Sequence, residues 1–185
     1  GRWAVTDRLT LGGAVAWLDA TYDEFPFATC TVDQVADPTN NPGCLREDGS
    51  NIEVALPPEA GGQDLSGETM QFAPKWSANV NATWLVPLTS RLDFRANLNV
   101  SYKDEYFSAL HQDPNTMHDA STKTDLRLAV QNHSGNWQLA IVGKNLTDEE
   151  TTLVNENVPV TNSGTYFGLP DRPRSIALQA QYIFD

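Results

Sequence analysis

The chain has 185 residues and a mass of 20.3 kDa, the size of one ordinary domain. Its 24 acidic and 12 basic residues give a net charge of −12, which argues against a nucleic-acid partner because binding phosphates requires clustered Lys and Arg. No stretch approaches the roughly 20 consecutive apolar residues of a membrane helix. This excludes a helical membrane protein but leaves open a membrane β-barrel, whose strands carry an apolar residue only at every second position.

Apolar residues at every second position mark the chain from its start, a pattern that predicts β-strands and no helix of comparable signal. The clearest case is 91–102, where Leu92, Phe94 and Leu98 alternate with Asp93 and Arg95. Six segments share the pattern, and their alternating residues are, in chain order, Leu9, Leu11, Gly13, Val15, Trp17; Trp76, Ala78, Val80, Ala82, Trp84, Val86; Leu92, Phe94, Ala96, Leu98, Val100, Tyr102; Leu126, Leu128, Val130; Trp137, Leu139, Ile141; and Ile176, Leu178, Ala180, Tyr182, Phe184.

The first predicted strand is followed by a long polar segment, 21–74, that contains both cysteines. Cys30 and Cys44 are 14 positions apart, and an even count in an acidic, loop-like segment favours a disulfide in an oxidising compartment over a thiol enzyme. Between Asp19 and Glu68 there are eleven acidic residues against one basic residue, Arg46. Either these charges keep a surface loop solvated, or they form an electrostatic filter that disfavours anionic ligands.

Short and long connections alternate between the later strands. Tight turns are predicted at 87–90 and 132–136, whereas 21–74, 103–123 and 145–173 are long and polar. Loops of more than about 15 residues are uncommon in a compact domain. A transmembrane barrel would explain why three such long loops lie at the same end of the strands. Such barrels have short turns on one side of the membrane and long external loops on the other.

Aromatic residues favour this barrel over a secreted β-sandwich, in which they would concentrate in the middle of the strands. They fall instead at both strand ends, as in the interface girdles of membrane barrels. The aromatic residues near the long loops are Trp17, Tyr22, Trp76, Tyr102 and Tyr106, and those near the short turns are Trp3, Trp84, Trp137, Tyr182 and Phe184. Six strands are fewer than the eight or so of the smallest single-chain barrels. The chain is therefore expected to be an antiparallel segment of a larger barrel, and its aromatic ending favours the C-terminal end.

Three short motifs resemble the C-terminal barrel portion of the TonB-dependent outer-membrane receptors. The most specific is Gly143-Lys144-Asn145-Leu146-Thr147-Asp148-Glu149, similar to a Gly-x-Asn-Leu-Thr-Asp stretch where the penultimate strand of these receptors reaches the outer surface. Weaker matches are Ala73-Pro74-Lys75-Trp76-Ser77 before one strand and Pro170-Asp171-Arg172-Pro173-Arg174 before the last. The resemblance covers nearly the whole of residues 1–185.

The resemblance implies a plugged barrel of about 22 strands in the bacterial outer membrane, of which these would be the last six. Its members import scarce ligands, commonly ferric siderophores, with energy delivered through TonB. The plug and the TonB box would belong to an N-terminal part absent from this chain. The family's terminal aromatic signal for the barrel-assembly machinery would fall on Tyr182 and Phe184, although here Asp185 follows. The implied partners are outer-membrane lipid, TonB, the assembly machinery and a small-molecule iron chelate.

No catalytic signature accompanies these features, so we expect no enzyme activity and no cofactor. There is no nucleophile elbow, phosphate-binding loop or Cys/His pair. His111, Asp113, His118 and Asp119 share one loop, but a seven-residue gap between the histidines is not a metal-ligand spacing. Four loop aromatics either contact a ligand or cap the barrel rim, namely Tyr106, Phe107, Tyr166 and Phe167. The charged residues Asp93, Arg95, Asp125 and Arg127, on the polar faces, are expected either to form ion pairs between neighbouring strands or to contact a plug.

The expected function is an active-transport receptor for a ferric siderophore or other iron complex. Two alternatives remain at this stage. One is a receptor for an oligosaccharide or a vitamin. The other, from a different class, is a secreted β-sandwich module for adhesion or carbohydrate binding.

Overall fold

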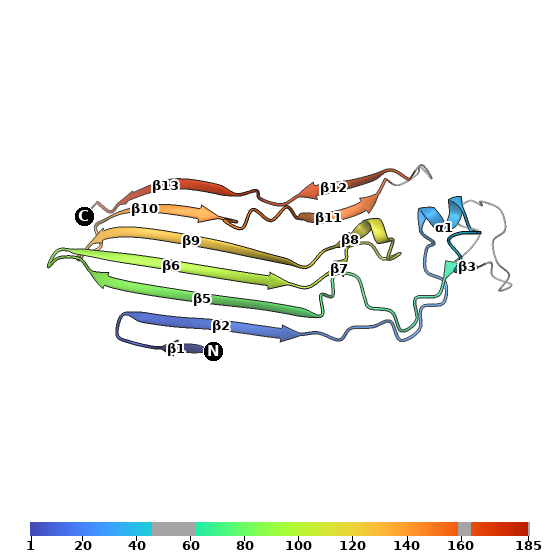
Figure 1. The fold of residues 1–185 in the computed structure, drawn as a ribbon, viewed down its shortest axis with the longest axis horizontal. Helices are drawn as coiled ribbons and strands as arrows, with labels where there is room; N and C mark the ends of the chain where they lie inside the picture. Colours follow the sequence, from blue (N-terminus) through green and yellow to red (C-terminus); the bar gives the residue numbers. More distant parts are fainter. Residues whose placement is uncertain (46–61, 159–163, 185) are drawn as a thin grey trace.

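A computed structural model describes residues 1–45, 62–158 and 164–184, and its main feature is one antiparallel sheet of seven strands. Figure 1 shows the strands side by side, and their order across the sheet is the order in which they occur in the chain. Across the sheet they are β1 (Arg2–Ala4), β2 (Leu9–Trp17), β5 (Trp76–Pro87), β6 (Leu92–Lys103), β9 (Ser121–Asn132), β10 (Trp137–Lys144) and β13 (Ser175–Tyr182). The predicted all-β, antiparallel fold class is confirmed.

The sheet has one more strand than the six predicted, and β9 is longer than predicted. β1 was missed because its three residues are too few to show an alternating pattern, yet Trp3 pairs with Leu11. β9 begins at Ser121 rather than Asp125, and β6 ends at Lys103. The added residues of β9 are polar on both faces, so hydrophobic alternation carries no signal there.

The connections separate into two kinds at opposite ends of the sheet, as predicted. Residues 5–8, 88–91 and 133–136 form short turns at one end, and Figure 1 shows them beside the C-terminus. The described parts of the long connections, 18–45, 62–75, 104–120, 145–158 and 164–174, all lie at the other end. Gly135 in the last short turn has φ +80°, a left-handed conformation that side chains other than Gly rarely adopt.

Pairing in register sorts the strands into an apolar and a polar face. Val80 lies opposite Val100, and Leu98 lies opposite Leu126, so apolar residues of neighbouring strands share one face. That face is open: Ile176 is 71 % exposed and Leu178 is 79 % exposed. No second sheet covers it within the described residues, as the core of a β-sandwich would require.

Aromatic side chains lie at both ends of the apolar face. The Trp17 and Trp76 rings are 6.5 Å apart at the end with the long connections. At the other end, Trp84 meets Phe94 edge-on at 6.3 Å. Two further aromatic residues at that end, Tyr182 and Phe184, also contact each other, with ring centroids 4.8 Å apart. The face thus has aromatic borders and an aliphatic middle.

The polar face carries hydrogen-bonded amides in place of most of the predicted ion pairs. Asn79 donates to Asn99 at 2.9 Å. The expected ion pair between neighbouring strands is present for Asp125, which binds Lys144 of β10 at 2.7 Å. The two arginines form no ion pair with a described residue, because the register sets Arg95 opposite Ala129 and Arg127 opposite Asn97.

Local structure fills the long connections. The first holds helix α1 (Val32–Ala36) and the pair β3 (Cys44–Leu45) and β4 (Gly62–Gln63). The second holds β7 (Tyr106–Phe107), the 3-10 turn η2 (Pro114–Thr116) and β8 (Met117–His118). The third holds β11 (Thr152–Asn157) and β12 (Tyr166–Pro170). Neither helical segment of the described chain has the length and apolar character needed to cross a membrane.

Candidate binding cleft between the long connections

A cleft opens where the second and third long connections meet the end of the sheet. Its larger cavity has a volume of about 1010 Å³ and is lined by segments 117–121, 148–152 and 170–173. A smaller cavity of about 480 Å³ adjoins it and shares His118, Asp119 and Asp171 with it. Volumes of this size suit a small organic ligand.

The floor of the cleft belongs to the polar face of the sheet. The smaller cavity is lined by Ser77, Ser101 and Lys123, which pair with polar-face positions of their neighbours. The Lys123 ammonium donates to the hydroxyl of Thr151 and to the carboxylate of Asp171. The hydrogen bond from Lys123 lowers the pKa of Asp171, and the backbone N–H of Arg172 adds to this effect. The cleft is therefore continuous with the polar side of the sheet.

His118 is one of the residues that line both cavities. Its imidazole is 6 % exposed and stacks on Tyr106, with ring centroids 4.6 Å apart and planes 5° apart. Burial lowers the pKa of His118, and the nearby Lys103 ammonium acts in the same direction, so the ring is neutral around pH 7. Nδ1 lies 3.4 Å from the Thr152 hydroxyl. Nε2 has no hydrogen-bond partner in the described part of the chain.

Several contacts join the second and third connections beside the cleft, and two of them are short hydrogen bonds. Asp113 is fully buried and accepts a hydrogen bond of 2.6 Å from the Tyr166 hydroxyl. Burial of Tyr166 and this bond to Asp113 raise the pKa of the phenol to about 12. The Ser108 hydroxyl donates to the Asn155 carbonyl at 2.6 Å. These contacts hold the two connections in one arrangement.

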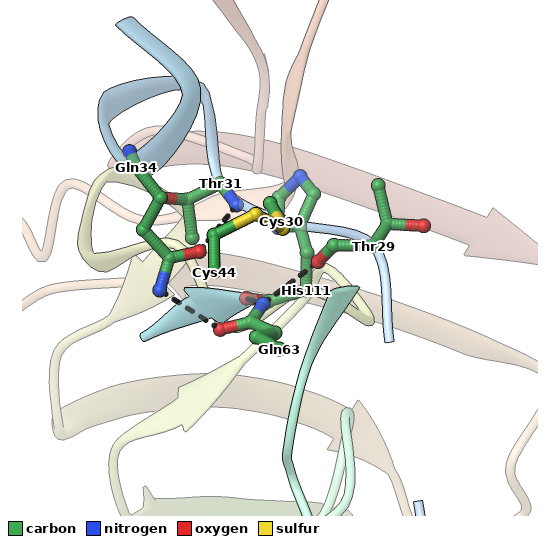
Figure 2. The surroundings of a disulfide bond; sticks show 7 residues. All are labelled: Thr29, Cys30, Thr31, Gln34, Cys44, Gln63 and His111. Carbon is green, nitrogen blue, oxygen red and sulfur yellow. Dashed lines mark hydrogen bonds between the residues drawn. A yellow bond between two sulfur atoms is a disulfide. The ribbon is translucent and has the colours of Figure 1, made fainter. Parts of the chain in front are cut away.

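The first connection attaches to the second through Gln63, next to the disulfide. Figure 2 shows the Gln63 amide donating to the carbonyls of Thr29 and His111, both at 2.7 Å. The predicted bond between Cys30 and Cys44 is present, with Cα atoms 5.6 Å apart. Four residues of the acidic segment, Glu47, Asp48, Glu53 and Glu59, lie outside the described residues together with Arg46.

Helix α1 was not predicted, although its sequence carries a signal. Thr31 caps its N-terminus and Gln34 reaches back to the Thr31 backbone, which completes a capping box. The spacing Thr-x-x-Gln is readable from sequence. No comparable pattern marks His118, Lys123 or Asp171, because their arrangement depends on which strands become neighbours.

The motif 143–149 begins in the last residues of β10. Its side chains contact the segment just before β13. Leu146 folds back over Gly143, where an added Cβ would lie 2.7 Å from a Leu146 methyl carbon. Asn145 is buried with φ +50° and donates to the carbonyls of Glu149 and Arg172. Asp148 forms an ion pair of 2.9 Å with Arg174. The motif thus positions one wall of the cleft.

The four candidate ligand-contacting aromatics occupy different environments. Tyr106 lines the smaller cavity. Phe107 pairs with Met117 in the short β7–β8 ladder, and the Tyr166 hydroxyl donates a hydrogen bond to Asp113. Phe167 is 42 % exposed on β12. The histidines and aspartates of 111–119 do not gather around one point, and no cluster of three or more metal-binding side chains occurs within 1–45, 62–158 and 164–184.

Comparison with known proteins shows the fold alone. No family model matches the sequence, and no curated protein matches it. Among solved structures, the chain is similar to the ferric yersiniabactin uptake receptor FyuA from Yersinia pestis, with a TM-score of 0.63 and 10 % sequence identity. The match covers 100 % of this chain and 22 % of the receptor, so the chain spans about a fifth of that protein. This chain is therefore similar in fold to part of an uptake receptor.

Proposed function

We propose that the chain is the C-terminal part of a TonB-dependent outer-membrane receptor that imports a scarce nutrient, a ferric siderophore or a related iron complex. The observation that carries the proposal is the two-sided sheet, with an exposed apolar face bordered by aromatic residues and a polar face of amides and charges. In a membrane barrel the first face meets lipid and the second faces the interior. The similarity in fold to a ferric-siderophore uptake receptor supports the proposal.

Each part of the chain has a role under this proposal. The sheet is a section of the barrel wall in the bacterial outer membrane, and β1 and β13 pair with strands of the remaining barrel. The long connections are external loops, and the cleft among them receives the ligand before transport. A plug and a TonB-contacting segment belong to another part of the receptor, and the role is transport rather than catalysis.

The location is tested on the outer-membrane fraction of the native organism, with an antibody against the acidic first connection and samples loaded boiled and unboiled. A band several times larger than 20.3 kDa that shifts on heating is expected, because folded barrels resist detergent until they are boiled. A 20 kDa band in the soluble fraction would end the transporter proposal.

The transport role is tested by growth on single ferric siderophores as the iron source. Deletion of the gene is expected to abolish growth on one of them, and deletion of TonB is expected to have the same effect. Growth that depends on the gene but persists without TonB would remove the energy-coupling part of the proposal.

A further inference from the structure

The polar face of the sheet is basic, although the chain as a whole is acidic. The seven strands contain six Lys or Arg residues and two carboxylates, so the sheet has a net charge of +4 while the chain has −12. The strand register places all eight charged residues on the polar face. The six cations are Arg2, Arg95, Lys103, Lys123, Arg127 and Lys144.

The lysines of this face have partners within the chain, but the arginines have no carboxylate. Two of the lysines form ion pairs, and Lys103 lies over an aromatic ring. Both carboxylates of the sheet contact other side chains, one a lysine at 2.7 Å and the other a histidine at 3.2 Å. Arg2 and Arg95 form no side-chain hydrogen bond or ion pair with a described residue, and Arg127 donates only to glutamine side chains.

Arg95 and Arg127 are diagonal neighbours on β6 and β9. The register sets Arg95 opposite Ala129, and Arg127 is two positions from Ala129 on the same face. Like charges on neighbouring strands repel each other, and an anion that binds both removes this repulsion. A guanidinium binds a carboxylate through paired N–H donors, which makes the carboxylate its best-matched partner. The pair therefore favours a carboxylate ligand.

The basic face is a broad surface with hollows rather than one pocket. Arg2 lines a hollow of about 330 Å³ over β1, β2 and β5. Arg127 lines another hollow of about 330 Å³ that extends over β5, β6, β9 and β10. Small ligands are held mainly in single concave pockets, whereas contacts between polypeptides extend over wide surfaces. This face fits a folded polypeptide segment better than a small molecule.

We propose that the polar face binds an acidic segment of the same receptor that lies outside residues 1–185, with Arg95 and Arg127 binding its carboxylates. The inference rests on the proposed function and names a partner of the sheet. The match to the solved receptor covers 22 % of that protein, so most of such a receptor lies beyond this chain. The chain's own acidic connections do not serve, since none of their described carboxylates forms an ion pair with either arginine.

The test uses the full-length receptor purified from outer membranes and a zero-length cross-linker. The double variant Arg95→Lys with Arg127→Lys keeps both charges and supplies amines. A carbodiimide joins such an amine to a carboxylate in contact with it, forming an amide as the carbodiimide takes up the water. Mass spectrometry of the digested receptor is expected to link position 95 or 127 to an Asp or Glu outside residues 1–185. The ion pair of Lys144 and Asp125 should also be linked and shows that the reaction works.

The absence of a link from positions 95 and 127, or links from them only to residues within 1–185, would overturn the inference. The wild-type receptor gives a second measurement that does not depend on the folding of a variant. Phenylglyoxal modifies arginines that it can reach from solvent, and it is expected to modify Arg95 and Arg127 about tenfold more slowly than Arg91, which is exposed in a short turn. Equal rates would show that the face is open to water and would also overturn the inference.

Removing the charge tests whether the guanidiniums hold the segment. Arg95→Gln with Arg127→Gln is expected to accelerate hydrogen exchange of the cross-linked segment about tenfold, since each charged hydrogen bond that is lost weakens the contact. Arg8→Gln with Arg91→Gln removes the same charge from the short turns and is expected to leave that exchange unchanged. Equal acceleration by both double variants would reduce the effect to net charge and contradict the proposed contact.

Two further outcomes separate this inference from the proposed function. Protection of both arginines from phenylglyoxal only when a ferric siderophore is added would assign them to the ligand and overturn the acidic segment. A receptor that is present in the outer membrane and imports a ferric siderophore, but gives no link from positions 95 and 127, would overturn this inference and leave the proposed function standing.

Discussion

Gly143 shows how one residue sets the path of the chain at the end of a strand. A Cβ at this position would lie 2.7 Å from Leu146, so Gly143→Ala is expected to destabilise the motif by about 1–3 kcal/mol. The midpoint of heat-induced band shift of the full receptor measures the effect. Adding Leu146→Ala gives the new methyl space, so the double variant should lose less than the sum of the two single variants; strict additivity would contradict the contact.

Tyr166 controls how the second and third connections are joined. Tyr166→Phe removes the bond to the buried Asp113 and is expected to lower the local opening free energy by about 1–3 kcal/mol. Hydrogen exchange of residues 106–118 measures it. Tyr22→Phe is the control, because the Tyr22 hydroxyl makes no hydrogen bond to the described residues; equal exchange in both variants would contradict the role.

The raised pKa of Tyr166 makes the stability of the second and third connections depend on pH. The pKa of this phenol is raised from the ordinary 10 to about 12, so the folded state favours the protonated form. The contribution to stability is therefore complete below pH 10 and is lost as the pH rises through about 12. Exchange of 106–118 should accelerate over this range in the wild-type receptor and less so in Tyr166→Phe, where the phenol is already absent.

At the scale of one strand, the two faces of β5 provide matched positions. Val80 lies midway between Trp76 and Trp84 on the apolar face, and Asn81 lies next to it on the polar face. Under the proposed barrel function, Val80→Lys is expected to cost about 2–4 kcal/mol, since it would place a charge near the middle of the bilayer, whereas Asn81→Lys should be tolerated. The amount of folded receptor in outer membranes measures both, and equal loss would contradict the assignment of faces.

At the scale of the whole molecule, the sheet leaves two edges and one large apolar face open. β1 and β13 each pair on one side only within the described chain. Residues 1–185 produced alone, without detergent, are expected to aggregate, since unpaired edges and exposed apolar faces associate. Light scattering during size-exclusion chromatography measures this, and a soluble monomer with a cooperative unfolding transition would contradict the barrel segment.

The strands of the sheet could be predicted because their information is local. Alternation along β5 or β6 shows which residues share a face without any knowledge of the neighbouring strand. The disulfide followed from the count and setting of Cys30 and Cys44. β1 and the first residues of β9 carry no such alternation, and tertiary pairing alone makes them strands.

The residues that form the cleft are known only from the tertiary structure. Asp113 and Tyr166 are 53 positions apart, and Gln63 and His111 are 48 apart, so nothing near either residue in sequence identifies its partner. The register likewise decided which charged residues form ion pairs, since Asp125 meets Lys144 whereas Arg95 lies opposite Ala129. The sequence by itself determined the two-faced strands and the ends at which they turn, because these depend on residues two positions apart. The cleft required the folded chain, because its walls come from segments that only strand pairing brings together.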